Sequence, residues 1–112
     1  KILRYPIGTG DFKTVAGEKF DLKKVRRVPL FIFLGDQDDN DSVIFGDSYD
    51  EEDKNLIFEL FGRTPVERWA ITKTLYEQSK LNAEFKLYPK VGHTVNAEMR
   101  EDIRAFFSKY TR

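Results

Sequence analysis

The chain has 112 residues, which allows one ordinary domain at most. Forty per cent of the residues are apolar, and no apolar run approaches the roughly 20 residues that a membrane-spanning helix needs. Lys plus Arg equals Asp plus Glu at 19 each, and cysteine is absent, which excludes a disulfide framework, a thiolate metal site and a cysteine nucleophile. We therefore expect a cytoplasmic protein without a membrane or nucleic-acid partner.

The first 27 residues predict an extended start followed by loops. Pro6 disfavours helical geometry at Tyr5, and two glycines, Gly8 and Gly10, come soon after it. A basic cluster ends this stretch: Lys23, Lys24, Arg26 and Arg27. We interpret this cluster as a solvated face rather than a nucleic-acid site, because it is short and the chain carries no net charge.

Residues 28–34, Val-Pro-Leu-Phe-Ile-Phe-Leu, predict a buried strand. They are apolar without alternation, which is typical of a strand in a parallel sheet covered by helices on both faces. The strand ends at Gly35, and an acidic loop with four aspartates follows it: Asp36, Asp38, Asp39 and Asp41.

Two helices are predicted after the acidic loop. The first runs from about Glu51 to Phe61, where apolar residues recur at helical spacing, and Gly62 caps its end. The second begins with a capping-box pattern, in which Thr64 is the cap and Glu67 lies three residues later. Pro65 and Trp69 belong to this second helix, and we expect Trp69 in the core.

A second strand and a last helix complete the predicted elements. Residues 83–88 alternate with period two, which predicts a half-buried strand ended by Pro89. The turn Gly92-His93-Thr94 follows, and then a helix with its large apolar residues on one face: Met99, Ile103, Phe106, Phe107 and Tyr110. We expect both Phe106 and Phe107 in the core.

The fold class is α/β, because two strands joined through helices form a parallel pair with a right-handed crossover. Such a pair alone is a smaller sheet than a typical domain contains. The chain also starts at Lys1 rather than at a methionine. We therefore expect residues 1–112 to form one partial domain, the C-terminal portion of something longer.

The candidate catalytic residues are Asp38 and His93. In parallel α/β sheets, functional groups collect at the carboxyl ends of the strands. Asp38 follows the first strand, and His93, the only histidine, follows the second. If these strands are neighbours, the carboxylate can accept the imidazole N–H, so Asp38 is the expected acid and His93 the base. Asp41 is an alternative acid, and both groups could instead be ordinary loop residues.

A family resemblance rests on these same loops. Gly35-Asp36-Gln37-Asp38 resembles the acid loop of α/β-hydrolases, and Tyr88-Pro89-Lys90-Val91-Gly92-His93 looks like their histidine loop. The segments Tyr5-Pro6-Ile7-Gly8 and Arg68-Trp69 resemble a bacterial esterase or peptidase-like subgroup. The resemblance implies hydrolysis of a small-molecule carboxylic ester or related acyl bond, with no cofactor and no metal.

The chain departs from that family in its nucleophile. The family presents a serine in a G-x-S-x-G turn, and no serine here is flanked in that way: Ser42, Ser48, Ser79 and Ser108. We therefore expect no activity from this chain alone. We also expect it to form a homo-oligomer, or to pair with the missing N-terminal half, through the unpaired edge of the first strand.

Two other functions stay open. A strand followed by Asp36-Gln37-Asp38 also resembles the DxD element of haloacid-dehalogenase-type phosphatases, which depend on magnesium. In a non-enzymatic α/β interaction module, Asp38 and His93 would be surface groups. A response to added magnesium should be seen only with the phosphatase.

Overall fold

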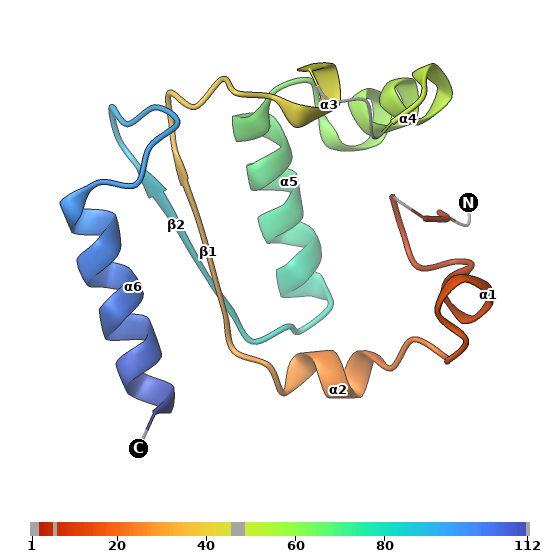
Figure 1. Ribbon diagram of the computed structural model, residues 1–112, viewed down its shortest axis with the longest axis horizontal. Helices are drawn as coiled ribbons and strands as arrows, with labels where there is room; N and C mark the ends of the chain where they lie inside the picture. The colour runs from red at the N-terminus through yellow and green to blue at the C-terminus, as the bar shows by residue number, and fades with distance from the viewer. Residues whose placement is uncertain (1–2, 6, 46–48, 112) are drawn as a thin grey trace.

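The computed structural model describes residues 3–5, 7–45 and 49–111. Pro6 of the Tyr5–Gly8 segment and Ser48 lie outside the described residues. The elements follow one another along the chain (Figure 1) in the order α1 (Phe12–Ala16), α2 (Leu22–Arg26), β1 (Leu30–Gly35), α3 (Ser42–Phe45), α4 (Glu51–Phe61), α5 (Pro65–Gln78), β2 (Ala83–Tyr88) and α6 (Ala97–Tyr110).

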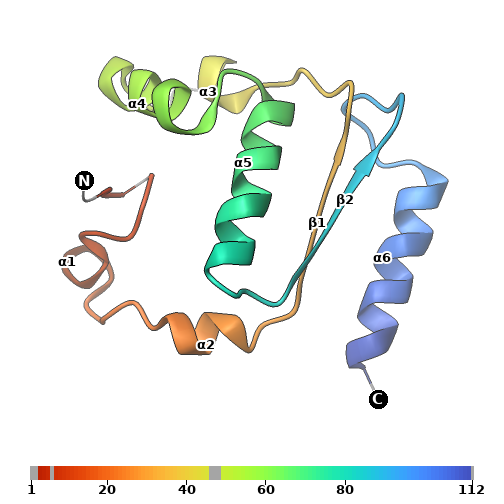
Figure 2. The same cartoon turned by 180° about the vertical axis from the view of Figure 1, so that it is seen from behind.

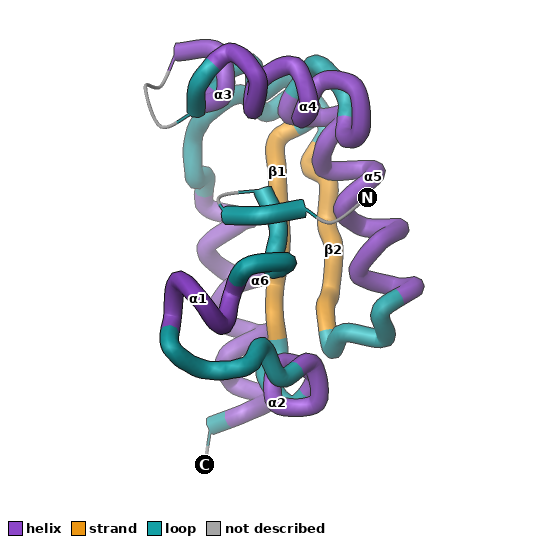
Figure 3. Tube along the Cα trace, turned by 90° about the vertical axis from the view of Figure 1, so that its right-hand side faces the viewer, coloured by secondary structure: helices purple, strands orange, loops and turns teal. Residues whose placement is uncertain are grey.

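The two strands run parallel and side by side (Figure 3), as the sequence predicts. Their register begins with Leu30 opposite Ala83 and ends with Gly35 opposite Tyr88. The Asp36 N–H donates to the Tyr88 carbonyl at 2.9 Å, so the pairing continues into the acidic loop. The described residues thus have an α/β-like architecture around a two-stranded parallel sheet.

Helices α5 and α6 cover opposite faces of the sheet (Figure 1; Figure 2). On one face, the Phe85 ring makes edge contacts with Trp69 and Tyr76 of α5, with centroid distances of 5.6 and 5.7 Å. On the other face, Phe31 stacks on Phe106 of α6 at 5.5 Å. Aromatic pairs of this kind contribute roughly 0.5–1.5 kcal/mol beyond the area they bury, so they hold both helices to the strands.

A polar contact also fastens α6 to the end of β2. Tyr88 is fully buried, and its hydroxyl donates to Asp102 Oδ2 at 2.6 Å. Lys86 forms an ion pair with the same oxygen at 2.7 Å. Burial, and then the hydrogen bond to Asp102, raise the pKa of the Tyr88 hydroxyl far above its ordinary value, so it remains a donor. The loop that carries His93 joins the two elements that this contact holds together.

The predicted start of α5 is confirmed, with one change in the capping box. Thr64 Oγ1 accepts the Glu67 N–H at 3.1 Å, but Glu67 Oε2 accepts the N–H of Arg63 rather than that of Thr64, at 2.7 Å. Gly62 packs directly against Glu67, since a Cβ at position 62 would lie 2.8 Å from the Glu67 Cβ. The Glu67 carboxylate therefore lies beside the peptide that joins Gly62 to Arg63, one residue before the cap.

Two predictions about residues 1–34 are wrong in detail. The first 27 residues contain two short helices as well as loops, and Asp21 caps α2 by accepting the Lys23 and Lys24 N–H groups. Strand β1 starts at Leu30 rather than at Val28, because the Val28 N–H closes the turn after α2 by donating to the Val25 carbonyl at 3.0 Å.

The expected burial of Phe107 is also wrong. Phe106 is 6% exposed, but Phe107 is 60% exposed. Neighbouring residues of an α-helix point about 100° apart, and here Phe106 stacks on Phe31 of the sheet while most of Phe107 remains in solvent. Within the described part of the chain, no helix is long and apolar enough to cross a membrane.

Candidate active site

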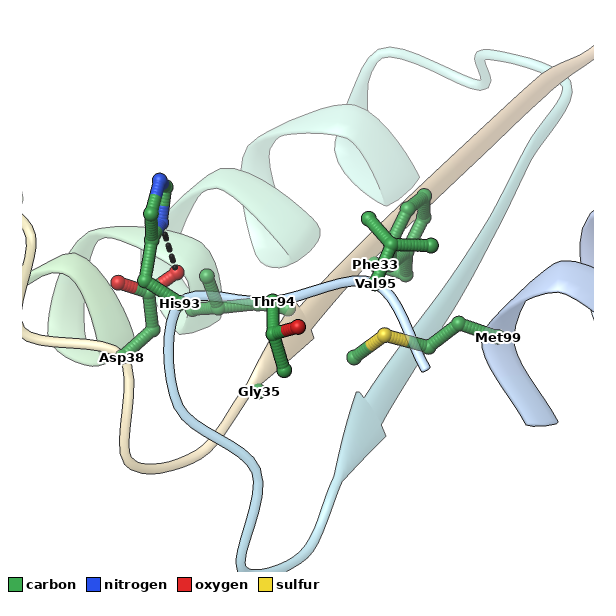
Figure 4. Close-up of a pocket in the computed structure, with 8 residues that line it drawn as sticks. Phe33, Gly35, Asp38, His93, Thr94, Val95 and Met99 are labelled. Atoms are coloured by element: carbon green, nitrogen blue, oxygen red, sulfur yellow. Dashed lines mark hydrogen bonds and ion pairs between the residues drawn. The ribbon is translucent and has the colours of Figure 1, made fainter. Parts of the chain in front are cut away.

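The acidic loop and the histidine loop leave neighbouring strands at the same edge of the sheet, and their two predicted site residues meet there (Figure 4). The Nδ1 atom of His93 lies 3.0 Å from Asp38 Oδ2, which confirms the predicted hydrogen-bond contact. The Asp38 side chain is 11% exposed and the His93 side chain is 64% exposed. The carboxylate is therefore mostly covered, while the imidazole remains open to solvent.

Asp38 uses both carboxylate oxygens. Its Oδ1 accepts the Asn40 N–H at 3.0 Å, and its Oδ2 faces the imidazole. An ionised carboxylate only accepts hydrogen bonds, so this contact favours the His93 tautomer that carries its proton on Nδ1. The lone pair is then on Nε2, which is the arrangement of a general base.

Direct backbone contact holds the two loops together. The Gln37 N–H donates to the Val91 carbonyl at 2.9 Å. Gly35 lies so close to the histidine loop that a Cβ there would be 2.2 Å from the Val91 oxygen and 2.7 Å from the Gly92 oxygen. Only glycine fits at the end of β1, because any other residue would push the histidine loop away from the sheet.

A small cavity of about 240 Å³ lies beside the pair. Phe33, Val95 and Met99 line it together with Asp38 and His93 (Figure 4). The cavity therefore combines apolar side chains with the imidazole of His93.

The cavity also includes one hydroxyl that sequence reasoning did not consider, that of Thr94. It follows His93 directly in the chain, and among the described residues no hydrogen bond joins it to the imidazole. Of the serines that the structure describes, none lines the cavity: Ser42, Ser79 and Ser108.

The alternative acid, Asp41, has a different partner. It is 3% exposed, and its Oδ1 pairs with Arg68 at 2.5 Å and accepts the Val43 N–H at 3.0 Å. Burial alone would raise the pKa of the Asp41 carboxyl, but the hydrogen bonds from Arg68 and Val43 outweigh it and hold the pKa below its ordinary value of 3.8. Asp38, and not Asp41, is thus the aspartate that contacts His93.

Arg68 was not assigned this role by sequence reasoning. Its guanidinium also donates to the Gly62 carbonyl at 3.1 Å, so it joins the end of α4 to the acidic loop. The only signal in the sequence was that Arg68 stands directly before Trp69, a residue that we expected in the core.

The two acidic groups of the Asp36-Gln37-Asp38 element bind separate partners. Asp36 Oδ1 accepts the Lys90 N–H at 2.7 Å, whereas Asp38 faces His93. Within residues 3–5, 7–45 and 49–111, no group of three or more His, Cys, Asp or Glu side chains is arranged to hold a metal ion.

The geometry defines an α/β-like protein with an Asp–His pair at the carboxyl ends of two parallel strands. Comparison of the chain with protein-family models, with curated proteins and with solved structures finds no match.

Proposed function

We propose that this chain supplies the acid and the base of a serine hydrolase that cleaves carboxylic esters or related acyl bonds, as the C-terminal portion of an α/β-hydrolase domain. The observation that carries the proposal is the 3.0 Å contact between Asp38 and His93 at the ends of neighbouring parallel strands. The order of the two residues, acid first and histidine 55 positions later, agrees with the nucleophile–acid–histidine order of that fold.

Each residue has a separate role in this reaction. His93 Nε2 takes the proton of the nucleophile's hydroxyl and later returns it to the leaving alkoxide. Asp38 holds the Nδ1–H and stabilises the imidazolium that forms between these steps. The nucleophile and the donors that stabilise the oxyanion come from polypeptide outside these 112 residues.

Two measures of compactness support a further polypeptide. The chain exposes 8462 Å², whereas a folded monomer of 13.1 kDa exposes roughly 6,400 Å². Its radius of gyration is 15.7 Å, compared with about 13 Å for a compact domain of this length. The excess of roughly 2,000 Å² is the size of a large, permanent interface.

The outer edge of β1 is the place where we infer that this polypeptide joins. The N–H groups of Leu30 and Asp36 point to β2, so the alternate residues Phe31 and Phe33 direct their backbone groups to the other edge. Among the described residues no strand pairs there. An apolar groove of about 230 Å³, which includes Phe31 and Phe107, runs beside this edge.

The occupant we propose is the segment that carries the nucleophile, because a parallel strand added here would have its carboxyl end at the same edge of the sheet as the Asp38 and His93 loops. Without it, the chain should associate with a second copy of itself at micromolar concentration, as light scattering would show. A compact monomer in that measurement would contradict the inference about the edge.

Activity tests the function directly. In a polypeptide that unites these residues with the nucleophile, His93→Ala should lower kcat for p-nitrophenyl acetate by at least about 10⁴-fold. Asp39→Ala, which removes a neighbouring exposed charge, should leave kcat unchanged. Wild-type turnover by the His93→Ala variant would disprove the role of His93. Activation by added Mg²⁺ would favour the phosphatase instead.

A further inference from the structure

Asp36 makes hydrogen bonds to the residues on both sides of Pro89 in the histidine loop. Its N–H donates to the Tyr88 carbonyl at 2.9 Å, and its carboxylate oxygen Oδ1 accepts the Lys90 N–H at 2.7 Å. Pro89 lies between these two attachment points. Asp36, the first residue after β1, thus fixes the path of the chain as it leaves β2.

The conformation of Lys90 indicates that this contact is constrained. Its φ of 59° is in the left-handed region, which is unfavourable for a residue other than glycine. Such a conformation persists where the surroundings require it. A charged carboxylate is a stronger acceptor than a neutral oxygen, so Asp36 is suited to hold this turn.

The distances along the chain connect this contact to the candidate site. Asp36 lies two residues before Asp38, and Lys90 lies three residues before His93. The contact between Nδ1 and Oδ2 is 3.0 Å long, and hydrogen bonds weaken quickly beyond about 3.2 Å. A displacement of the histidine loop by about 1 Å would therefore break the pair.

We propose that Asp36 is a positioning residue that fixes the imidazole of His93 against Asp38. The proposal rests on the proposed function in taking this pair as acid and base. Its test, however, needs no nucleophile and no turnover, because the pair itself has a spectroscopic signature.

That signature is the position of the proton on the neutral imidazole. His93 is the only histidine in the chain, so the ring signals in ¹⁵N NMR need no assignment. At a pH where the ring is neutral, the intact chain should show the Nδ1–H form that Asp38 selects. Asp36→Ala should lose this preference in favour of the Nε2–H form.

Two control variants distinguish the loss of the Asp36 acceptor oxygen from the loss of a negative charge in the loop. Asp36→Asn keeps an acceptor oxygen at the same place and should retain the Nδ1–H form. Asp39→Ala removes one exposed negative charge from the same loop and should also retain the Nδ1–H form.

A second measurement needs no variant. In the intact chain, the Lys90 amide should exchange with solvent more slowly than the amide of a free peptide. Exchange at the free rate would overturn the proposal even if Asp36→Ala fails to fold.

An Asp38→Ala variant distinguishes failure of this proposal from failure of the function. If Asp38→Ala loses the Nδ1–H form while Asp36→Ala retains it, the pair stands and Asp36 does not position it. If Asp38→Ala also retains that form, Asp38 does not hold the imidazole, and the proposed function fails with it.

Discussion

Asp38 and Asp41 lie three residues apart in one loop, yet their surroundings are opposite. Asp41 is 3% exposed and faces Arg68, a permanent cation whose side chain is only 16% exposed. Asp38 faces His93, a titratable group whose side chain is 64% exposed. A buried pair of fixed charges can hold a loop in place, whereas an open pair with an imidazole can move a proton.

The buried pair and the open pair depend on each other through the loop. Arg68 attaches the far end of the loop to α5 and, through the Gly62 carbonyl, to the end of α4. Asp36 attaches the near end to the histidine loop. Asp38 thus lies between two anchors, which is how a surface loop can present a carboxylate in a fixed position.

The largest effect on stability is expected from breaking the buried pair of Asp41 and Arg68. Arg68→Ala would leave the Asp41 carboxylate buried without its cation, and it should lower the free energy of unfolding by about 3 kcal/mol. Urea unfolding at pH 7 measures this loss. Arg104→Ala is the matched control, because Arg104 and its partner Glu101 are both exposed, and such pairs contribute at most about 1 kcal/mol. An equal loss of unfolding free energy in Arg68→Ala and Arg104→Ala would show that the buried pair contributes no more than an exposed one.

Acid should weaken the same pair, by less than the loss of Arg68 does. The pKa of Asp41 is lower in the folded chain than its ordinary value of 3.8, so the unfolded chain binds the proton more tightly. The stabilisation is complete above pH of about 4 and is lost as pH falls through the folded pKa. Urea midpoints between pH 5 and pH 2.5 should fall less steeply for Asp41→Asn than for the original chain. Parallel curves would contradict this.

Local sequence signals were enough to predict the framework of this site. An uninterrupted apolar run and a period-two segment identify β1 and β2, and Gly62 and Thr64 mark helix ends that the structure confirms. Because the strands are parallel, the acidic loop and the histidine loop had to open at one edge. The contact between Asp38 and His93 follows from that topology.

Tertiary contacts decided what the sequence could not predict. Four aspartates share one loop, and which of them meets the imidazole depends on the position of Arg68, which belongs to a helix 27 residues later. The helices α1 and α2 have five residues each, too short to show a repeating apolar pattern. Phe107 was misplaced because apolar character alone does not tell which of two adjacent helical residues faces the sheet.

A smaller effect is expected where α6 joins β2. Tyr88→Phe keeps the buried ring and removes the hydroxyl that donates to Asp102, so unfolding should become easier by about 1 kcal/mol. Asp102 keeps its ion pair with Lys86, which limits the loss. Tyr110→Phe, at a half-exposed tyrosine of α6, is the control and should cost less. No difference between the two variants would mean that the Tyr88 hydroxyl does not hold α6.

The smallest effect should come from His93 itself. The imidazole is open to solvent, and Asp38 retains the Asn40 N–H when the ring is removed, so one of its hydrogen bonds persists. His93→Ala should therefore change the free energy of unfolding by no more than about 0.5 kcal/mol, measured by urea unfolding at pH 8, where Arg68→Ala still shows its full loss. That result would agree with the proposed role of His93 in chemistry rather than in stability. A loss near that of Arg68→Ala would instead put His93 among the structural groups, and the difference between the Asp41–Arg68 pair and the Asp38–His93 pair would disappear.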